Sequence, residues 1–355
     1  ARRPHRMQPI TPKVTLLIAA YNEEDVIEAK LENCLALEYP RDRLEIVVVA
    51  DGSTDRTPEL AHRYRTCGVR VEYRPERRGK IHAINRVMPL VQGDIVVSSD
   101  ANSLLNPECL RHLVRHFADP QVACVAGEKR IMRRAGDVSA GEGLYWRYES
   151  YLKRCDSELS SVMGAAGELI ALRRSVYEPV EEDTIIEDFV LSMRLVDQGL
   201  RVIYEPEAYS VEAASPSIGE EFKRKTRIVA GGWQAVVRLG HLLYPRRPLI
   251  TFQYVSHRVL RWVLVPFLLI LAMLTNALLA LEGPALYRVL WLGQVLFYAL
   301  AAYGWNRQAH GGRHPMYYVP FYFAFLNYAA LVGGLRFMRG SQPVTWEKVR
   351  RATPI

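Results

Sequence analysis

Three long apolar runs in the C-terminal third constrain this chain most. Trp262 to Leu281, Val289 to Asn306 and Pro315 to Leu335 contain 20, 18 and 21 residues, and none of them carries a charged side chain. About 20 apolar residues of helix cross the hydrocarbon core of a bilayer, so each run is long enough to span it. A buried helical hairpin in a soluble protein is the alternative, but three such runs in succession are unusual there. We therefore expect a multi-pass membrane protein.

The charges beside these runs give conflicting information on topology. The positive-inside rule places Arg258, Arg261 and the loop 306–314 in the cytoplasm. Three full crossings then put the tail 336–355 outside, although it contains five Lys or Arg residues. Either the tail is external, or one run is interfacial or re-entrant. The segment 219–243 is predicted to form an amphipathic helix on the membrane surface, and an ordinary surface helix is the alternative.

Composition excludes several classes of protein. Hydrophobic residues make up 49% of the chain, enough for a core, which rules out a mainly disordered protein. The five Cys residues are scattered without zinc-like spacing, which indicates reduced thiols in a cytosolic environment. The formal net charge of +8 suggests an anionic partner such as lipid headgroups or a phosphorylated small molecule. We expect no nucleic-acid partner, because the basic groups lack interleaved aromatic residues.

Strand-like and helix-like segments alternate before the apolar runs. Apolar, β-rich strands are predicted at 13–20, 44–50, 69–73, 94–99 and 122–127, and helices at 24–38, 55–66, 80–92 and 107–118. This alternation predicts an α/β domain with a mostly parallel sheet covered on both faces. The expected organisation is a basic segment 1–12, a catalytic domain 13–215, amphipathic interface helices 216–257, about three transmembrane helices in 258–338, and a tail 339–355.

Polar residues follow four consecutive predicted strands, where doubly wound sheets bind ligands. They are Tyr21 and Glu23, then Asp51 and Ser53, then Lys80, then Asp100 and Asn102. A carboxylate can accept hydrogen bonds from a nucleotide base or ribose, Asp100 and Asn102 can supply oxygen ligands to a divalent cation, and Lys80 can contact phosphate. Helix caps, turns and a solvated charge run are the alternatives for single members of this set.

Other segments indicate how phosphate is held and which residues could act as a base or approach an acceptor. The sequence has neither a Walker P-loop nor a GxGxxG fingerprint, since Ala19-Ala20-Tyr21-Asn22 follows the first strand, so metal and side chains are expected to hold phosphate. Asp188, at the start of a helix-like run, is a candidate general base or a helix cap. The segment from Gly164 to Glu168 is either a flexible turn or a place where the backbone approaches an acceptor closely.

Seven ordered blocks resemble the membrane-associated family 2 glycosyltransferases, which include cellulose, hyaluronan, chitin and poly-N-acetylglucosamine synthases. The blocks are IAAYNEE (18–24), VVVADGSTD (47–55), ERRGKIHAIN (76–85), SSDAN (98–102), GAAG (164–167), IIEDF (185–189) and RKTR (224–227). The resemblance implies a GT-A fold, a UDP-sugar donor, Mg²⁺ or Mn²⁺, and inversion at the anomeric carbon. Members usually have an N-terminal membrane segment, so we expect this chain to be a trimmed form.

The resemblance also implies roles for individual residues. It implies nucleotide contacts by Ala19, Tyr21, Glu23, Asp51, Ser53, Lys80 and Asp100, metal binding by Asp100 and Asn102, catalysis by Asp188, and diphosphate or acceptor contacts by Gly164, Gly167, Glu187, Arg224, Arg227 and Trp233. Three blocks depart from the family pattern. Asn102 replaces the second Asp of the DxD motif, Ile186 precedes the acidic pair of the TED motif, and Ile228 replaces the Trp of QxxRW.

The function predicted from the sequence is metal-dependent transfer of a sugar from a UDP-sugar to a lipid acceptor or a growing polysaccharide. The expected location is the inner membrane, with the catalytic domain in the cytoplasm and membrane lipids as partners. A single-addition glycolipid synthase, similar to ceramide glucosyltransferase, is the alternative enzyme. A membrane-anchored nucleotide-binding subunit is the alternative without catalysis. The sequence does not indicate an oligomeric state.

Overall fold

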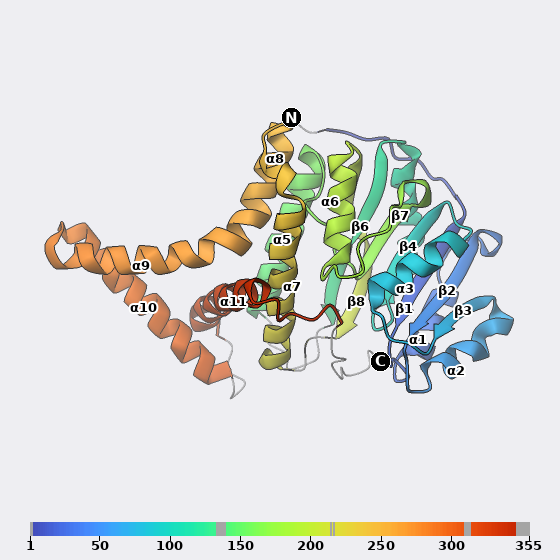
Figure 1. Cartoon of the computed structure of the whole chain (residues 1–355), viewed down its shortest axis with the longest axis horizontal. Helices are drawn as coiled ribbons and strands as arrows, with labels where there is room; N and C mark the ends of the chain where they lie inside the picture. Colours follow the sequence, from blue (N-terminus) through green and yellow to red (C-terminus); the bar gives the residue numbers. More distant parts are fainter. Residues whose placement is uncertain (1–2, 133–139, 214, 216, 309–313, 346–355) are drawn as a thin grey trace.

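The apolar runs of the N-terminal two thirds form one sheet of eight strands (Figure 1). The computed structural model describes residues 3–132, 140–213, 215, 217–308 and 314–345. The strands are β1 (Val14–Ala20), β2 (Leu44–Asp51), β3 (Val69–Arg74), β4 (Ile95–Asp100), β5 (Leu104–Leu105), β6 (Val122–Met132), β7 (Leu169–Arg173) and β8 (Arg201–Ala213). The five strands predicted from the sequence are therefore confirmed, with the fifth extended to Met132.

The sheet is mixed rather than wholly parallel. Its strand order is β3-β2-β1-β4-β7-β6-β8-β5. The strands β3, β2, β1 and β4 pair in parallel, whereas β7 is antiparallel to both of its neighbours, β4 and β6. β8 pairs in parallel with β6. The order reverses after β1, and this switch brings the ends of β1, β2 and β4 to one edge of the sheet.

Helices cover both faces of the sheet and bury its alternating side chains. They are α1 (Ile27–Leu35), α2 (Thr57–His62), α3 (Lys80–Val87), α4 (Cys109–Val114), α5 (Ala140–Leu159) and α6 (Glu187–Asp197), with short 3₁₀ segments at Arg41–Arg43, Arg63–Cys67, Met88–Leu90, Arg115–Ala118 and Arg174–Val176. On β2, Val47 and Val49 pack in one core with α3 and α6, while Ile46 and Val48 pack in the other with α1 and α4. A period of two residues along each strand thus creates two hydrophobic layers.

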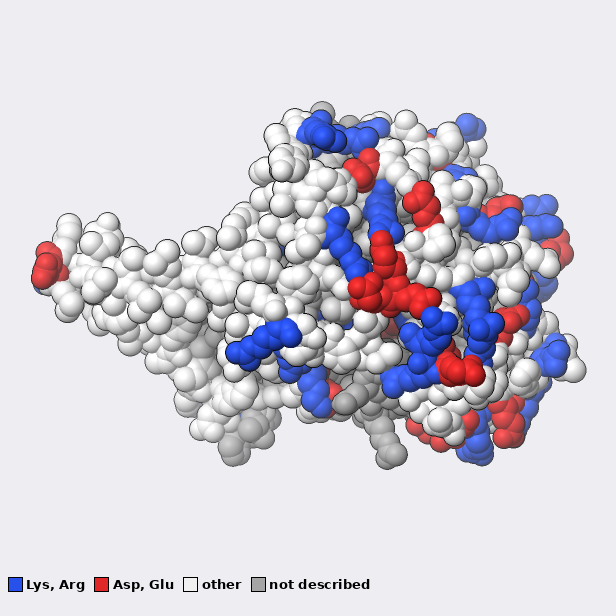
Figure 2. Space-filling view, viewed as in Figure 1, with Lys and Arg blue, Asp and Glu red and all other residues white. Residues whose placement is uncertain are grey.

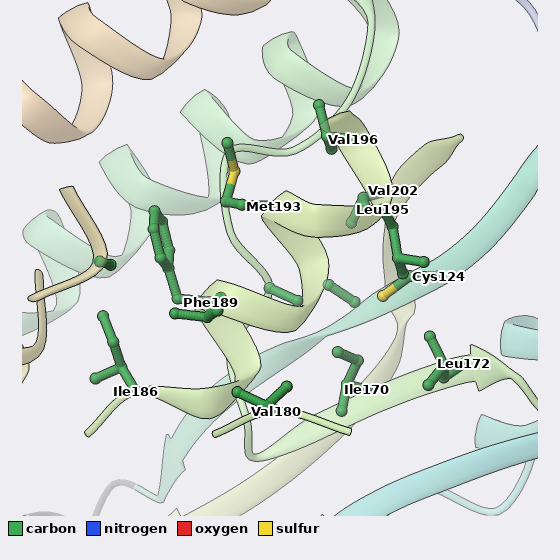
Figure 3. Close-up of a cluster of buried hydrophobic side chains, with 14 of the residues drawn as sticks. Cys124, Ile170, Leu172, Val180, Ile186, Phe189, Met193, Leu195, Val196 and Val202 are labelled. Carbon is green, nitrogen blue, oxygen red and sulfur yellow. The ribbon is translucent and has the colours of Figure 1, made fainter. Parts of the chain in front are cut away.

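The packing of α6 fixes where its first residues lie. Phe189, Met193 and Val196 of α6 pack in one cluster with Cys124 of β6 and Ile170 of β7 (Figure 3). Burial of such side chains stabilises a fold by about 1.5–3 kcal/mol each. Because the apolar face of α6 is fixed on the sheet, Glu187 and Asp188 in its first turn have a fixed position above the strand ends.

All the regular secondary structure in the described residues of the C-terminal third is helical. It contains α7 (Ile218–Arg238), a 3₁₀ segment Gly240–Leu243, α8 (Pro248–Tyr254), a π-helix (Val255–Leu264), α9 (Val265–Glu282), α10 (Ala285–Gln308) and α11 (Pro315–Met338). The three apolar runs lie in α9, α10 and α11, and each is long and apolar enough to cross a membrane. Figure 1 shows α9 and α10 extending away from the sheet, whereas α11 lies beside α7.

The predicted amphipathic helix is α7, and protein surrounds its apolar face. Gly231 lies against Ile185 and Ile186, and Gly333 of α11 lies close to the backbone of Thr226. Ser217 caps the helix by accepting a hydrogen bond from the backbone N–H of Glu220 (3.2 Å). α7 therefore joins the catalytic domain to α11.

Close packing of α11 on α7 gives a stability prediction. A Cβ at Gly333 would lie 2.7 Å from the carbonyl oxygen of Thr226, whereas a Cβ at Gly293 of α10 would meet no atom within 4 Å. Gly333→Ala should therefore lower the melting temperature in detergent by roughly 3–10 °C, and Gly293→Ala should leave it unchanged or slightly higher. Equal melting temperatures for the two variants would contradict this packing.

Candidate active site

A cavity of about 500 Å³ opens at the ends of β1, β2 and β4. Its wall also includes the start of α6, one side of α7 and the chain that follows α11. Parallel strands point their carboxyl ends to the same edge, and their loops carry polar side chains, so this is the expected ligand site. Figure 2 shows Lys, Arg, Asp and Glu gathered on this body, while the helical projection is almost free of charge.

Asp51 lines the cavity, and within the described residues only one of its two carboxylate oxygens accepts hydrogen bonds. Its side chain is 5% exposed, and its Oδ2 accepts hydrogen bonds from the backbone N–H groups of Arg78 (3.0 Å) and Gly79 (2.7 Å). Its Oδ1 is buried and has no hydrogen-bond partner among the residues that the structure describes. A buried unpaired acceptor is costly, so this atom suits an N–H or O–H donor of a ligand.

The loop after β2 is shaped around Asp51. Gly52 has φ +69°, and any Cβ there would collide with Arg77. The Arg77 guanidinium lies 3.8 Å from the centre of the Tyr21 ring, within the range of a cation–π contact. Tyr21 and Arg77 both line the cavity beside Asp51. Glycine is therefore required for the close approach of these two loops.

Lys80 bridges acidic groups in the middle of the cavity. Its Nζ lies 2.7 Å from Asp100 Oδ1 and 3.5 Å from Glu187 Oε1. Burial lowers the pKa of Lys80, but Asp100 and Glu187 outweigh burial and hold that pKa above its usual value. Lys80 therefore remains a cation that can face a phosphate group.

Asp100 and Asn102 meet the chemical requirements of a divalent cation that enters with a diphosphate. Both line the cavity and both offer side-chain oxygen atoms. Within the part of the chain that the structure describes, no group of three or more His, Cys, Asp and Glu residues is arranged to hold a metal. Mg²⁺ commonly takes only one or two protein carboxylates and completes its shell with water and substrate phosphates, so this sparse donor set fits.

Asp188 has the properties of a general base. Burial and the neighbouring Glu187 carboxylate raise the pKa of Asp188 to about 7, against the opposing effect of Lys80. A Cβ at Gly167 would lie 3.0 Å from Asp188 Oδ2, so the absence of a side chain there leaves room for the carboxylate. A base with a pKa near neutrality combines ionisation with strong proton affinity.

Buried ion pairs form the far side of the cavity. Lys129 Nζ lies 2.6 Å from Glu168 Oε1 and 2.7 Å from Glu212 Oε2. Arg224 pairs with Glu221 at 2.8 Å. Burial raises the pKa of Glu168, but Lys129 outweighs burial and holds that pKa below its usual value. This end of the cavity thus carries matched charges, unlike the acidic end at Asp188.

Arg227 links α7 to the segment after α11. Its guanidinium donates to the carbonyl oxygen of Ile185 (2.8 Å) and, more distantly, to that of Val344 (3.4 Å). Sequence reasoning missed several cavity-lining residues: Lys129, Glu212, Ser215, Arg336 and the four residues 342–345. No local motif marks these residues. Arg336 and residues 342–345 reach the cavity only because of the path that α9, α10 and α11 take in three dimensions.

Most of the predicted site residues meet at the cavity. Its lining includes Ala19, Tyr21, Glu23, Asp51, Lys80, Asp100, Asn102, Gly167, Glu187, Asp188, Arg224 and Arg227. Ser53, Gly164 and Trp233 are not part of this lining. Their contacts with a ligand stay predictions that this cavity does not support.

Local contacts explain these three positions. The Ser53 hydroxyl is buried and accepts a hydrogen bond from the backbone N–H of Asn22 (3.1 Å), so it holds two loops together. Gly164 packs against the ring of Phe189. Trp233 donates from Nε1 to the carbonyl oxygen of Trp262 (3.1 Å), which fixes α7 to the π-helix.

An α/β domain with acidic and basic loops at the carboxyl ends of its parallel strands has the ligand-binding arrangement of the doubly wound class of folds. Residues 15–180 match the family model described as Glycosyl transferase family 2. The whole chain is similar in fold to the structure titled "Mannosyltransferase PcManGT from Pyrobaculum calidifontis in complex with GDP-Man and Mn2+", with a TM-score of 0.74, 24% identity, and coverage of 95% of this chain and 90% of that one. Residues 15–180 therefore match a family 2 glycosyltransferase domain, and the chain has the GT-A fold of that similar structure.

Two curated relatives add to this assignment. The chain is 29% identical over 232 residues to poly-beta-1,6-N-acetyl-D-glucosamine synthase of Staphylococcus aureus (strain MSSA476), and 25% identical over 231 residues to that of Staphylococcus epidermidis. Each match covers 63% of this chain and 56% of the relative. The chain thus spans little more than half the length of these relatives.

The raised pKa of Asp188 predicts the pH dependence of sugar transfer. A base acts only when it is ionised, so kcat/KM should fall about tenfold per pH unit below pH about 7 and level off above it. Asp188→Asn should reduce transfer by roughly 10²–10⁴-fold and should remove the decrease in kcat/KM at low pH.

The same variant separates catalysis from folding. Because the pKa of Asp188 is higher in the folded chain than in the unfolded chain, its ionised form destabilises the fold at pH 7 and above. Asp188→Asn should therefore keep or raise the melting temperature at pH 8. Transfer by this variant within a few fold of the parent rate would refute the assignment of the base.

Proposed function

We propose that this chain is a glycosyltransferase that moves a sugar from a UDP-sugar to a hydroxyl of a membrane-associated acceptor or growing polysaccharide, with inversion at the anomeric carbon. One observation carries the proposal: Asp51, Asp100 and Asp188, from three distant segments, line one cavity. They supply a nucleotide acceptor group, an oxygen ligand for a cation, and a base, which are the three functions that the transfer requires.

The donor is held by side chains rather than by a glycine-rich loop. The unpaired Oδ1 of Asp51 suits the N–H of a uracil ring, and Tyr21 offers an aromatic surface beside it. Lys80 and Arg227 both line the cavity and would contact the diphosphate. Asp100 and Asn102 would hold Mg²⁺ or Mn²⁺, which when bound neutralises charge on the diphosphate. The Mn²⁺ and sugar nucleotide named for the similar mannosyltransferase structure support this arrangement.

The transfer itself is a single displacement. Asp188 removes the proton of the acceptor hydroxyl as that oxygen forms a bond to the anomeric carbon. The bond from this carbon to the diphosphate oxygen breaks on the opposite face, and UDP leaves with the electron pair. Lys80 and Arg227 stabilise the charge that develops on the leaving group, because they are already positioned before the reaction.

Two kinds of acceptor remain candidates. The curated relatives are poly-N-acetylglucosamine synthases, which supports a growing polysaccharide. Ile228 lines the cavity where the family motif has Trp, so this wall lacks an aromatic ring for a sugar to stack on. That departure favours a single addition to a lipid. The inner membrane is the proposed location, with the catalytic domain in the cytoplasm.

A donor screen tests the proposed function. The purified chain should release UDP from one of UDP-glucose, UDP-N-acetylglucosamine and UDP-galactose. GDP-mannose is the comparison donor, because its nucleobase is guanine rather than uracil. EDTA should abolish release, and Mg²⁺ or Mn²⁺ should restore it. Product length on a sizing gel then separates polymer from single addition. Release from GDP-mannose alone would refute the uridine assignment.

Substitution of Asp51 tests the nucleotide end of the cavity. Asp51→Ala should weaken UDP binding by roughly 10–100-fold, since the variant loses both the ligand contact and the hydrogen bonds from Arg78 and Gly79. Glu76→Gln, an exposed change in the loop before Gly79, is the matched control and should bind UDP like the parent. Isothermal titration calorimetry measures both variants, and equal affinities would contradict the assignment.

A further inference from the structure

The three apolar helices differ in how much protein surrounds them. The most apolar 18-residue windows of α9 and α10 are only 11% and 6% buried, whereas that of α11 is 50% buried. Figure 1 shows α9 and α10 as a hairpin that extends from the body, and Figure 2 shows that this projection carries almost no charge except at its tip. The hairpin thus has the surface of a membrane-embedded unit.

A side-chain hydrogen bond joins the two helices of the hairpin. Asn276 of α9 is 8% exposed and donates a hydrogen bond to Gln294 of α10 (2.8 Å). Side-chain hydrogen bonds between helices are favourable in hydrocarbon, where no water replaces them. The charged residues near the connection are Glu282 and Arg288, at the far end from the catalytic domain.

Both ends of the three-helix stretch are attached to the catalytic domain. At the beginning, Arg258 donates to the carbonyl oxygen of Met163 (2.6 Å) and Arg261 pairs with Glu149. At the end, residues 342–345 line the active-site cavity. A chain that leaves and returns on the same side of a membrane crosses it an even number of times, so three crossings are inconsistent with these contacts.

The packing of α11 identifies the helix that does not cross. Phe222 of α7 packs against Phe325 and Tyr328 of α11, and Gly333 meets the backbone near Thr226. The same part of α7 carries six charged residues: Glu220, Glu221, Lys223, Arg224, Lys225 and Arg227. Such a density of charge is not tolerated at the depth of the hydrocarbon core. α11, bound along this segment, therefore lies outside that core.

We propose that α9 and α10 alone cross the bilayer as a hairpin, and that α11 lies on the catalytic side, between the membrane surface and α7. This topology removes the conflict in the charges. Arg258, Arg261, Arg307, Arg336 and Arg339 then share the cytoplasmic side, as the positive-inside rule requires.

The exposed side of α11 has the composition of an interface helix. Met316, Val319, Phe323 and Met338 are exposed, whereas Tyr318 and Tyr322 are buried in the protein. A helix with one apolar face exposed and the other face packed on polar protein suits the boundary between headgroups and acyl chains. We therefore place this side against the headgroup region of the same leaflet, where it brings the active-site cavity close to the membrane surface.

Cysteine labelling of the full chain tests the topology. Cys67 and Cys155 are replaced by Ser, while the buried Cys34, Cys109 and Cys124 are retained. Single cysteines are then introduced as Ala285→Cys at the tip, Gln308→Cys at the end of α10, and Ser341→Cys after α11. Spheroplasts are treated with a membrane-impermeant maleimide–polyethylene glycol before or after lysis, and labelling is measured by gel shift.

The expected result is labelling of position 285 in intact spheroplasts, and of positions 308 and 341 only after lysis. Labelling of position 341 in intact spheroplasts would show three crossings and overturn the proposal. Labelling of position 285 only after lysis would show that the hairpin does not cross, and would overturn it as well. Pro284→Cys is a second tip variant if Ala285→Cys is not produced. The readout needs no substrate, so its outcome is independent of the proposed donor and acceptor.

Discussion

The ion pair between Lys80 and the acidic groups around it is the interaction on which the active site depends. Asp100, Glu187 and Asp188 approach one another at the strand ends, and like charges in a half-buried cavity repel. Lys80 lies 2.7 Å from Asp100 and 3.5 Å from Glu187. Its positive charge offsets this repulsion but does not lower the pKa of Asp188 to its usual value. Burial and Glu187 raise the pKa of Asp188 to about 7, although Lys80 acts in the opposite direction. One cation thus permits both an oxygen-rich site for a divalent ion and a base of near-neutral pKa.

The membrane attachment and the active site share structural elements. α7 carries Arg224 and Arg227 on its cavity side and packs against α11 on another. The π-helix before α9 is joined to the loop of Met163, directly before the Gly164–Gly167 turn beside Asp188. The apolar helices are therefore in contact with the segments that shape this side of the cavity.

Much of the site could be predicted from the sequence because it depends on local order. Parallel strands place their following loops at one edge, so Asp51, Lys80 and Asp100 could be grouped without a structure. Trp233 could not be placed this way, since its position depends on which face of α7 meets Trp262. Likewise, Ser53 sits next to Asp51 in sequence but turns to the Asn22 loop. Spacing alone does not specify the direction of a side chain.

The sequence by itself determined the α/β class, the order of the parallel strands' loops, and the presence of three apolar helices, because hydrophobic periodicity and run length are local properties. Only the tertiary structure decided that β7 is antiparallel, that residues 342–345 reach the cavity, and that α11 packs on α7. These features depend on contacts between residues about 75 to more than 250 positions apart. Their physical basis is burial and complementary packing between surfaces, which hydropathy along one segment does not encode.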